Sequence, residues 1–310
     1  MGARIVEGAA TAAAIRETLR PRIDVFRAAA GRPPSLRILL VGDDPASQVY
    51  VRNKVKSSSE QGLDVALERL DETASLADVL GVVGRWNADD RIDGILVQSP
   101  LPPALGKGSM HRVFDAIDPR KDVDGFHPVN AGLLAQQRPA LVPCTPAGVI
   151  EMLKRERVPL SGARAVVIGR SEIVGRPMAL LLLQHDVTVT ICHSKTRDLP
   201  GVARSADILV AAMGRPAFVT PEFVMPGAAV VDVGVNRVSS EEQARAIFGE
   251  GSAKHDQFLR KGSVLVGDVH PRVADVAGLL TPVPGGVGPL TIVMLLANTI
   301  RAAEDRRRRG

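Results

Sequence analysis

Short apolar runs recur along this chain, and each is followed by a loop and a segment with helical spacing. "LRILLVG" (36–42) and "IDGILVQ" (92–98) lie in its first half. Continuous apolar runs that alternate with helices are typical of parallel strands, because helices cover both faces of such a sheet. The pattern therefore predicts an α/β fold. Further runs of this kind occupy 164–169, 187–192, 206–214, 228–234 and 263–269.

The runs form two series, which predicts two domains with a boundary near residue 140. A helix is expected to begin at Thr145-Pro146, inside a second domain over 141–280. The segment 281–303 combines a Gly/Pro loop with a final helix, and the basic segment 304–310 is interpreted as a solvated tail.

The composition argues against several classes of protein. A net charge of +5 suits phosphates or an acidic substrate, whereas 3% aromatic residues leave little to stack on nucleic-acid bases. Cys144 and Cys192 form no CxxC motif, so we expect no disulfide framework or zinc site and a reducing cytoplasm. No apolar run has the length of a membrane span. We expect neither a nucleic-acid nor a membrane partner.

The stretch "AVVIGRSEIVGRPMALLL" has the order strand, glycine turn, helix. Gly169 and Gly175 allow the close backbone approach that a dinucleotide pyrophosphate needs at a helix N-terminus, although any tight turn of such a sheet has similar residues. The next strand ends in "CHSKT", where an NAD site places a carboxylate. Ser194 and Lys195 stand there instead, and Arg170 in the first turn is also basic, which favours NADP. The alternative is that Lys195 and Arg197 are exposed loop charges without a ligand.

The stretch "SQVYVRNKVK" follows Asp44 and Pro45, which are typical of a helix start, and the helix is expected to end near Gly62. Ser47, Tyr50 and Lys54 share one helical face. Gln98 ends a strand, and ligands of open α/β sheets bind beyond strand carboxyl ends. These residues form a plausible acid/base set, but a helical lysine is also commonly a solvated charge.

The loop "PRKDVDGFHP" offers Asp122 and Asp124. Such a loop is either a turn or a place for a divalent cation. Because no third carboxylate or histidine lies at ligand spacing, we predict no metal.

Several blocks together go beyond these general patterns, and the chain resembles the bifunctional methylenetetrahydrofolate dehydrogenase/methenyltetrahydrofolate cyclohydrolase family over about residues 4 to 300. The resemblance implies an N-terminal α/β catalytic domain (1–140, completed by 281–303), a Rossmann-like NADP-binding domain, and a final helix that returns to the N-terminal domain. It also implies NADP-dependent oxidation of 5,10-methylenetetrahydrofolate, hydrolysis of the product to 10-formyltetrahydrofolate, a role in purine biosynthesis, and a homodimer formed through the cofactor domain. The blocks are "GDDPASQVYVRNKVK", "DGILVQSPLP", "KDVDGFHPVNAG", "PCTPAG", "VVIGRSEIVGRPMA", "CHSKT", "VDVGVNR", "GDV" and "TPVPGGVGPLT".

The family pattern assigns roles to individual residues of this chain. It makes Lys54 the central catalytic group, with Gln98 beside it and Tyr50 against the folate. It places Asp124 on the pterin and gives Asp122 a structural role. At the folate, the pattern also assigns Ser47 and three residues of the "PGGVG" loop, Pro284, Gly285 and Gly286. At the cofactor, it assigns Gly169, Arg170, Ser171, Ser194 and Val235.

The chain departs from the family pattern over 239–262, which is expected to form an exposed helical hairpin. Three alternatives stay open at this point. They are a family member with dehydrogenase activity alone, a protein that senses NADP without turnover, and a two-domain reductase similar to shikimate dehydrogenase.

Overall fold

The computed structural model describes residues 2–309, and the chain divides into two compact units. The N-terminal unit comprises Ala12–Cys144 and the segment from Thr291 onward. The central unit comprises Thr145–Leu290 and the segment up to Thr11. Helices α1 (Gly8–Ala30), α6 (Cys144–Arg155) and α11 (Gly288–Arg309) carry the chain from one unit into the other.

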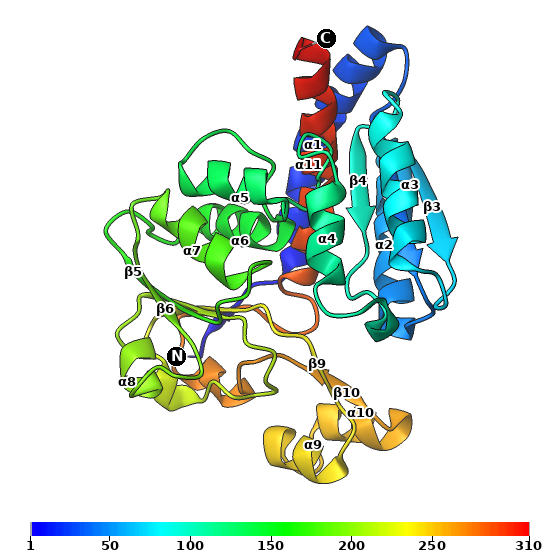
Figure 1. Cartoon of the computed structure of the whole chain (residues 1–310). Helices are drawn as coiled ribbons and strands as arrows, with labels where there is room; N and C mark the ends of the chain where they lie inside the picture. The colour runs from blue at the N-terminus through cyan, green and yellow to red at the C-terminus, as the bar shows by residue number, and fades with distance from the viewer. Residues whose placement is uncertain (1, 310) are drawn as a thin grey trace. The chain divides into compact units, whose positions relative to one another are not determined.

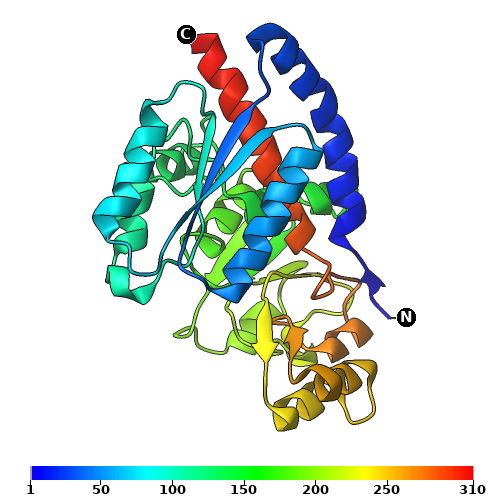
Figure 2. The ribbon, with the colours of Figure 1, turned by 90° about the vertical axis from the view of Figure 1, so that its right-hand side faces the viewer.

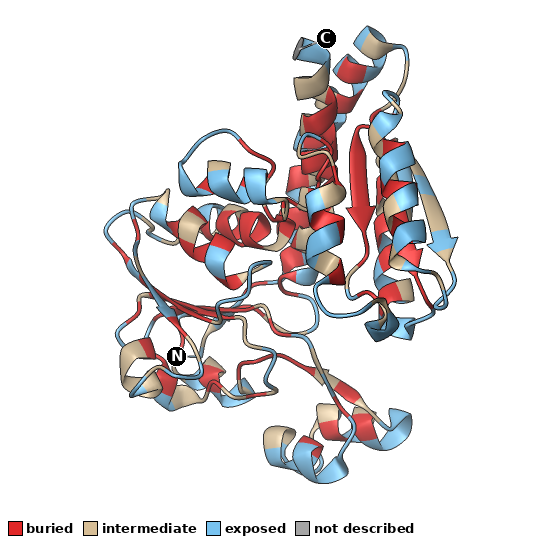
Figure 3. Cartoon of the chain, in the orientation of Figure 1, coloured by how far each residue is buried: buried red, intermediate tan, exposed pale blue. Residues whose placement is uncertain are grey.

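The N-terminal unit is built on a parallel three-stranded sheet with the order β3-β2-β4. Its central strand, β2 (Ser35–Val41), is buried along almost its whole length. β4 (Gly94–Val97) is fully buried, whereas the edge strand β3 (Asp64–Leu70) has alternating exposed positions (Figure 3). The helices of this unit, besides parts of α1 and α11, are α2 (Pro45–Glu60), α3 (Leu76–Ala88), α4 (Ser109–Ala116) and α5 (Pro128–Ala135), with the 3₁₀ turn η1 (Pro103–Leu105).

Helix α2 begins where the sequence predicts. The Asp44 carboxylate accepts a hydrogen bond from the backbone N–H of Ser47, and Pro45 occupies the first turn, where its missing N–H is not needed. Ser47, Val51, Lys54 and Ser58 form the buried face of this helix. The fold thus turns Lys54 inward.

Helices α1 and α11 lie side by side in the N-terminal unit (Figures 1 and 2). Arg22 of α1 donates two hydrogen bonds to the Glu304 carboxylate of α11. The final helix therefore returns to the N-terminal unit, which confirms that prediction.

The central unit contains a parallel six-stranded sheet with the order β1-β11-β8-β7-β5-β6. Each pair of neighbouring strands in this sheet is parallel, as in a doubly wound fold. Together with the parallel three-stranded sheet, this confirms the predicted α/β class. Its strands are β1 (Arg4–Ile5), β5 (Arg164–Ile168), β6 (Thr188–Cys192), β7 (Ile208–Ala211), β8 (Ala229–Asp232) and β11 (Leu279–Leu280). Its helical elements are α6, α7 (Gly175–Leu183), α8 (Leu199–Ala203), η2 (Pro221–Phe223) and η3 (Pro271–Asp275).

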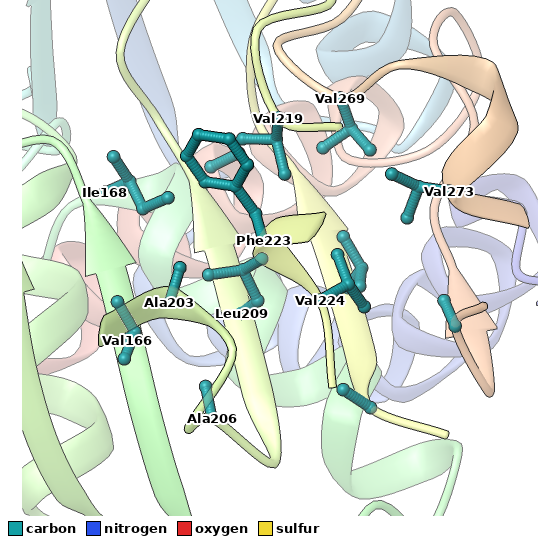
Figure 4. Close-up of a cluster of buried hydrophobic side chains, with 14 of the residues drawn as sticks. Val166, Ile168, Ala203, Ala206, Leu209, Val219, Phe223, Val224, Val269 and Val273 are labelled. Atoms are coloured by element: carbon teal, nitrogen blue, oxygen red, sulfur yellow. The ribbon is translucent and has the colours of Figure 1, made fainter. Parts of the chain in front are cut away.

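One face of this sheet packs into an almost wholly aliphatic core (Figure 4). Val166 and Ile168 of β5 and Leu209 of β7 lie in it beside Phe223, an aromatic residue in a chain that has few. Burial of these side chains stabilises the sheet by about 1.5–3 kcal/mol for each large one.

The run 263–269 does not join the parallel sheet, so that part of the strand prediction is wrong. Its strand, β10 (Val264–Val266), pairs antiparallel with β9 (Asn236–Val238). Helices α9 (Glu241–Phe248) and α10 (Ala253–Lys261) connect the two strands, as the predicted helical hairpin requires. Ala244, Phe258, Val264 and neighbouring residues give this arm a small core of its own.

No helix within residues 2–309 is both long and apolar enough to cross a membrane.

Candidate active site

Lys54 and Gln98 form the centre of a polar cluster in the N-terminal unit. The Lys54 Nζ donates a hydrogen bond of 3.0 Å to the Gln98 Oε1. The Gln98 Nε2 donates in turn to the Ser99 carbonyl at 2.6 Å, which turns the amide oxygen toward the lysine. Lys54 is 8% exposed and Gln98 9% exposed. A solvated surface lysine is therefore excluded for Lys54.

The segment Lys121–Asp124 runs beside β4 and approaches this pair. The N–H of Ile95 donates to the Lys121 carbonyl at 2.7 Å, and Ile95 forms an isolated parallel bridge with Asp122. Burial raises the pKa of Asp124, the positive charge of Lys54 lowers it, and the neighbouring Asp122 raises it. Asp124 thus lies within electrostatic reach of Lys54. Its buried carboxyl group gives up its proton less readily than the carboxyl group of an exposed aspartate.

Two buried anchors hold this segment in place. The Lys121 ammonium is 1% exposed and donates to the carbonyls of Trp86, Asn87 and Asp89 at the end of α3. Asp122 accepts from the backbone N–H groups of Gly125 and His127 and from Asn130, although burial raises its pKa. The hydrogen bonds of the Asp122 carboxylate therefore stabilise the loop itself.

Ser47 and Tyr50 lie on α2, within the turns that precede Lys54. Ser47 is buried, whereas Tyr50 is 45% exposed. An exposed aromatic ring one helical turn before a buried lysine is available to a flat ligand. The helix therefore presents Tyr50 to solvent and withdraws Lys54.

Two residues beside the cluster were missed by the sequence analysis. Burial raises the pKa of the Cys144 thiol well above its ordinary value, and the charge of Asp124 raises it further. Asn298 of α11 donates to the carbonyls of Val123 and Val142 and to the Cys144 Sγ. An amide within the apolar run "VMLLANTI" was the available signal, because buried amides are normally hydrogen-bonded.

The glycine turn of the central unit has the geometry of a phosphate loop. Gly169 has φ +128°, and a side chain there would collide with the Ala212 carbonyl. A side chain on Gly175, the first residue of α7, would collide with the Gly169 carbonyl. The Ser171 Oγ accepts from the N–H groups of Val174 and Gly175. The turn is therefore as tight as close approach to a pyrophosphate requires.

The other predicted cofactor residues follow neighbouring strands of the same sheet. Ile168 of β5 pairs with Cys192 of β6, so the turns after these strands lie at one edge. Arg170 and Ser194 are exposed there. Val235, 51% exposed, comes shortly after β8 at this edge. These residues fit a dinucleotide with an additional phosphate, because guanidinium and hydroxyl groups are phosphate donors.

The "PGGVG" loop follows β11, also at the carboxyl edge of the six-stranded sheet. Pro284 and Gly285 are exposed, whereas Gly286 is buried and donates to the Pro282 carbonyl. The Gly8 N–H donates to the Gly285 carbonyl. The loop is a defined turn with two exposed residues.

Asp232 and Asp268 form a second carboxylate pair, at the base of the β9–β10 arm. Asp232 accepts from the N–H groups of Gly234, Asp268 and Val269, and burial raises its pKa to about 7. Asp268 accepts from three consecutive N–H groups, Met213 to Arg215, and from the Asn236 amide. The pair ties the arm to the ends of β7 and β8. Within residues 2–309, no three histidine, cysteine or acidic side chains are arranged to hold a metal ion.

Comparison with known proteins gives one consistent result. Residues 6–124 match the catalytic domain of tetrahydrofolate dehydrogenase/cyclohydrolase, and residues 143–307 match its NAD(P)-binding domain. A relative from Koribacter versatilis (strain Ellin345), "Bifunctional protein FolD", is 51% identical over 307 residues, which cover 99% of both chains.

Solved structures agree with this match. The bifunctional enzyme FolD from Campylobacter jejuni is 39% identical with a TM-score of 0.85, over 98% of this chain and 99% of that one. The Trypanosoma brucei methylenetetrahydrofolate dehydrogenase-cyclohydrolase, solved with NADP cofactor and an inhibitor, is 36% identical with a TM-score of 0.87, over 99% of both.

Proposed function

The chain belongs to the tetrahydrofolate dehydrogenase/cyclohydrolase family, and from this premise we propose how its residues carry out the two reactions. It oxidises 5,10-methylenetetrahydrofolate to 5,10-methenyltetrahydrofolate with NADP and hydrolyses that product to 10-formyltetrahydrofolate. The observation that carries the proposal is the buried hydrogen bond between Lys54 and Gln98.

The oxidation needs positioning more than it needs a base. The nitrogen next to the methylene carbon stabilises the developing cation, and NADP, when bound, accepts the hydride. We assign Gly169, Arg170, Ser171 and Ser194 to the cofactor phosphates and ribose, and Val235 to the nicotinamide side. The tight glycine turn and the exposed donors support this assignment.

The hydrolysis needs proton transfers, which we assign to Lys54. Water adds to the methenyl carbon and loses a proton to the Lys54 amine. The carbon–nitrogen bond then breaks, and the departing nitrogen takes up a proton from the lysine. Gln98 supports this role because its carboxamide orients the amine at 3.0 Å without the negative charge that would hold it as an ammonium.

The remaining residues of the cluster orient the substrate. We assign Asp124 to the pterin ring, because its carboxyl group lies within electrostatic reach of Lys54 and can accept hydrogen bonds from the ring. Tyr50 stacks against the folate, Ser47 lines the same site, and the loop Pro284–Gly286 borders it. The exposed ring of Tyr50 and the two exposed loop residues support these roles.

We also propose that the protein is a cytoplasmic homodimer that associates through its cofactor domain. β6 is the edge strand of the six-stranded sheet, and Ile191 on it and Leu183 on α7 are exposed. Both cysteines are free, as in a reducing compartment. The 10-formyl product fits a supply of one-carbon units to purine biosynthesis. The folate domain would comprise Ala12–Cys144 with the segment from Thr291 onward, and the cofactor domain Thr145–Leu290 with the segment up to Thr11.

One preparation tests both proposed activities and the choice of cofactor. A dehydrogenase assay follows the absorbance of the reduced cofactor with NADP and with NAD, and a cyclohydrolase assay follows the loss of methenyltetrahydrofolate. We expect both activities and a preference for NADP. Oxidation without hydrolysis would indicate a dehydrogenase alone, cofactor binding without turnover would indicate a sensor, and a preference for NAD would contradict the assigned pocket.

A further inference from the structure

A cavity of the N-terminal unit lies at the opposite end of β4 from the Lys54 cluster. It has a volume of about 640 Å³ and opens between α1, α5 and the last turns of α11. Asp93, which lines it, immediately precedes β4, whereas Gln98 immediately follows that strand. The cavity is therefore separate from the Lys54 cluster, and its volume is typical of a small-molecule site.

One wall of this cavity is apolar. Phe26 of α1 and Val129 and Leu133 of α5 contribute to it, together with Leu141 and Ala302. Val129 is 50% exposed, so its side chain is accessible to a ligand in the cavity. This wall suits an apolar body.

The rest of the lining is mainly cationic. Five arginines, Arg32, Arg120, Arg301, Arg306 and Arg307, face three aspartates, Asp90, Asp93 and Asp305. The lining thus carries a net positive charge, which attracts anions.

Asp93 makes one side of the cavity rigid. Its carboxylate is buried and accepts from the Arg32 guanidinium at 2.6 and 2.9 Å. Arg306 donates to the Ile92 carbonyl and lies 3.3 Å from Asp93. Arg306 was expected in a solvated tail, but its side chain is only 15% exposed. A preformed site of this kind loses little entropy when it binds a ligand.

Two arginines can turn to a ligand, because Arg301 forms only a partly exposed ion pair and Arg307 forms none with a described side chain. The nearest carboxylate to Arg301 is that of Asp305, at 3.6 Å. Arg307 is exposed and makes no hydrogen bond or ion pair with any side chain that the structure describes. A guanidinium group binds carboxylate or phosphate through two parallel hydrogen bonds.

We propose that this cavity binds a small molecule that joins an apolar body to a carboxylate or phosphate group. The apolar body packs against Phe26 and Leu133. Its anionic group pairs with Arg307 and Arg301.

Calorimetric titration of the full chain tests the proposal. The probes are 2-naphthoate and 2-naphthyl phosphate, with 2-naphthylmethanol as the neutral control. R307E and R301E each replace one of the two cations with an anion. R308E is the matched control, because Arg308 does not line this cavity and, like Arg301, forms an ion pair with Asp305.

We expect one anionic probe per chain to bind, with a dissociation constant that rises at least tenfold in R307E and in R301E and less than twofold in R308E. The tighter of the two anions identifies the headgroup. The proposal is overturned if the neutral probe binds as well, if R308E loses as much affinity as R307E, or if saturating methenyltetrahydrofolate displaces the probe.

Discussion

The Nζ of Lys54 lies 3.0 Å from the Oε1 of Gln98, and the Nε2 of Gln98 donates a hydrogen bond of 2.6 Å to the Ser99 carbonyl. Lys54 therefore has a neutral hydrogen-bond acceptor, the Gln98 amide oxygen. The Ser99 carbonyl at the end of β4 sets the orientation of that amide. A carboxylate in that place would favour the charged ammonium, which cannot accept a proton.

Gln98→Glu tests the neutrality of this acceptor. The new carboxylate keeps the shape of the amide but holds Lys54 as an ammonium, so we expect the cyclohydrolase rate at neutral pH to fall about tenfold or more. The rate should recover as the pH is raised. A pH–rate profile of the variant beside the wild type measures this, and identical profiles would contradict the role given to Gln98.

Lys121→Met tests the anchor of the Asp124 segment. The substitution leaves the carbonyls of Trp86, Asn87 and Asp89 without their donor, so we expect the free energy of unfolding to fall by roughly 2–4 kcal/mol. Urea denaturation measures the change. Lys107→Met is the control, because Lys107 is exposed. Equal, small effects in both variants would show that the buried ammonium does not stabilise the loop.

Arg170→Ala tests the choice of cofactor. If the guanidinium contacts the additional phosphate, the KM for NADP rises about tenfold or more while the KM for NAD changes little. Steady-state kinetics with both cofactors provide the comparison. Arg204→Ala removes the same charge from the end of α8 and should leave both values unchanged. A parallel rise for NADP and NAD would argue against a phosphate contact.

The raised pKa of Asp232, about 7, predicts a pH dependence of stability. The neutral form is favoured in the fold, whereas the unfolded carboxyl ionises near pH 4. The free energy of unfolding should therefore fall as the pH rises from about 4 to 7, by at most about 1.4 kcal/mol per pH unit, and then level off.

Asp232→Asn provides the comparison for that effect. The amide does not titrate, so the stability of wild type relative to the variant should decrease between pH 5 and pH 7. Thermal unfolding over this range measures the difference. A difference that stays constant with pH would mean that Asp232 is already ionised at pH 5.

The sequence predicts much of this fold because its buried parallel strands are continuous apolar runs. It does not distinguish β10 from them, since a strand that packs on two short helices is equally apolar. It misses β3, whose half-exposed edge position places Glu68 and Arg69 within the strand. The local sequence pattern does not indicate whether a strand lies at the edge or in the middle of a sheet, or with which strand it pairs.

In the candidate site, too, the sequence predicts local neighbours but not contacts between distant residues. Helical spacing brings Tyr50 and Lys54 together, but the contact between Lys54 and Gln98 joins residues 44 positions apart. Nothing local indicates that Lys121 is buried or that Arg306 of the arginine run pairs with Asp93. Such positions depend on tertiary partners, which a single sequence does not contain.

The cyclohydrolase rate of Lys54→Ala tests the central claim most directly. The decay of methenyltetrahydrofolate absorbance is followed with the variant, the wild type and buffer alone, after thermal unfolding has shown that the variant is folded. We predict that the variant hydrolyses methenyltetrahydrofolate no faster than buffer does. Hydrolysis at the wild-type rate would contradict the assignment of the proton transfers to Lys54.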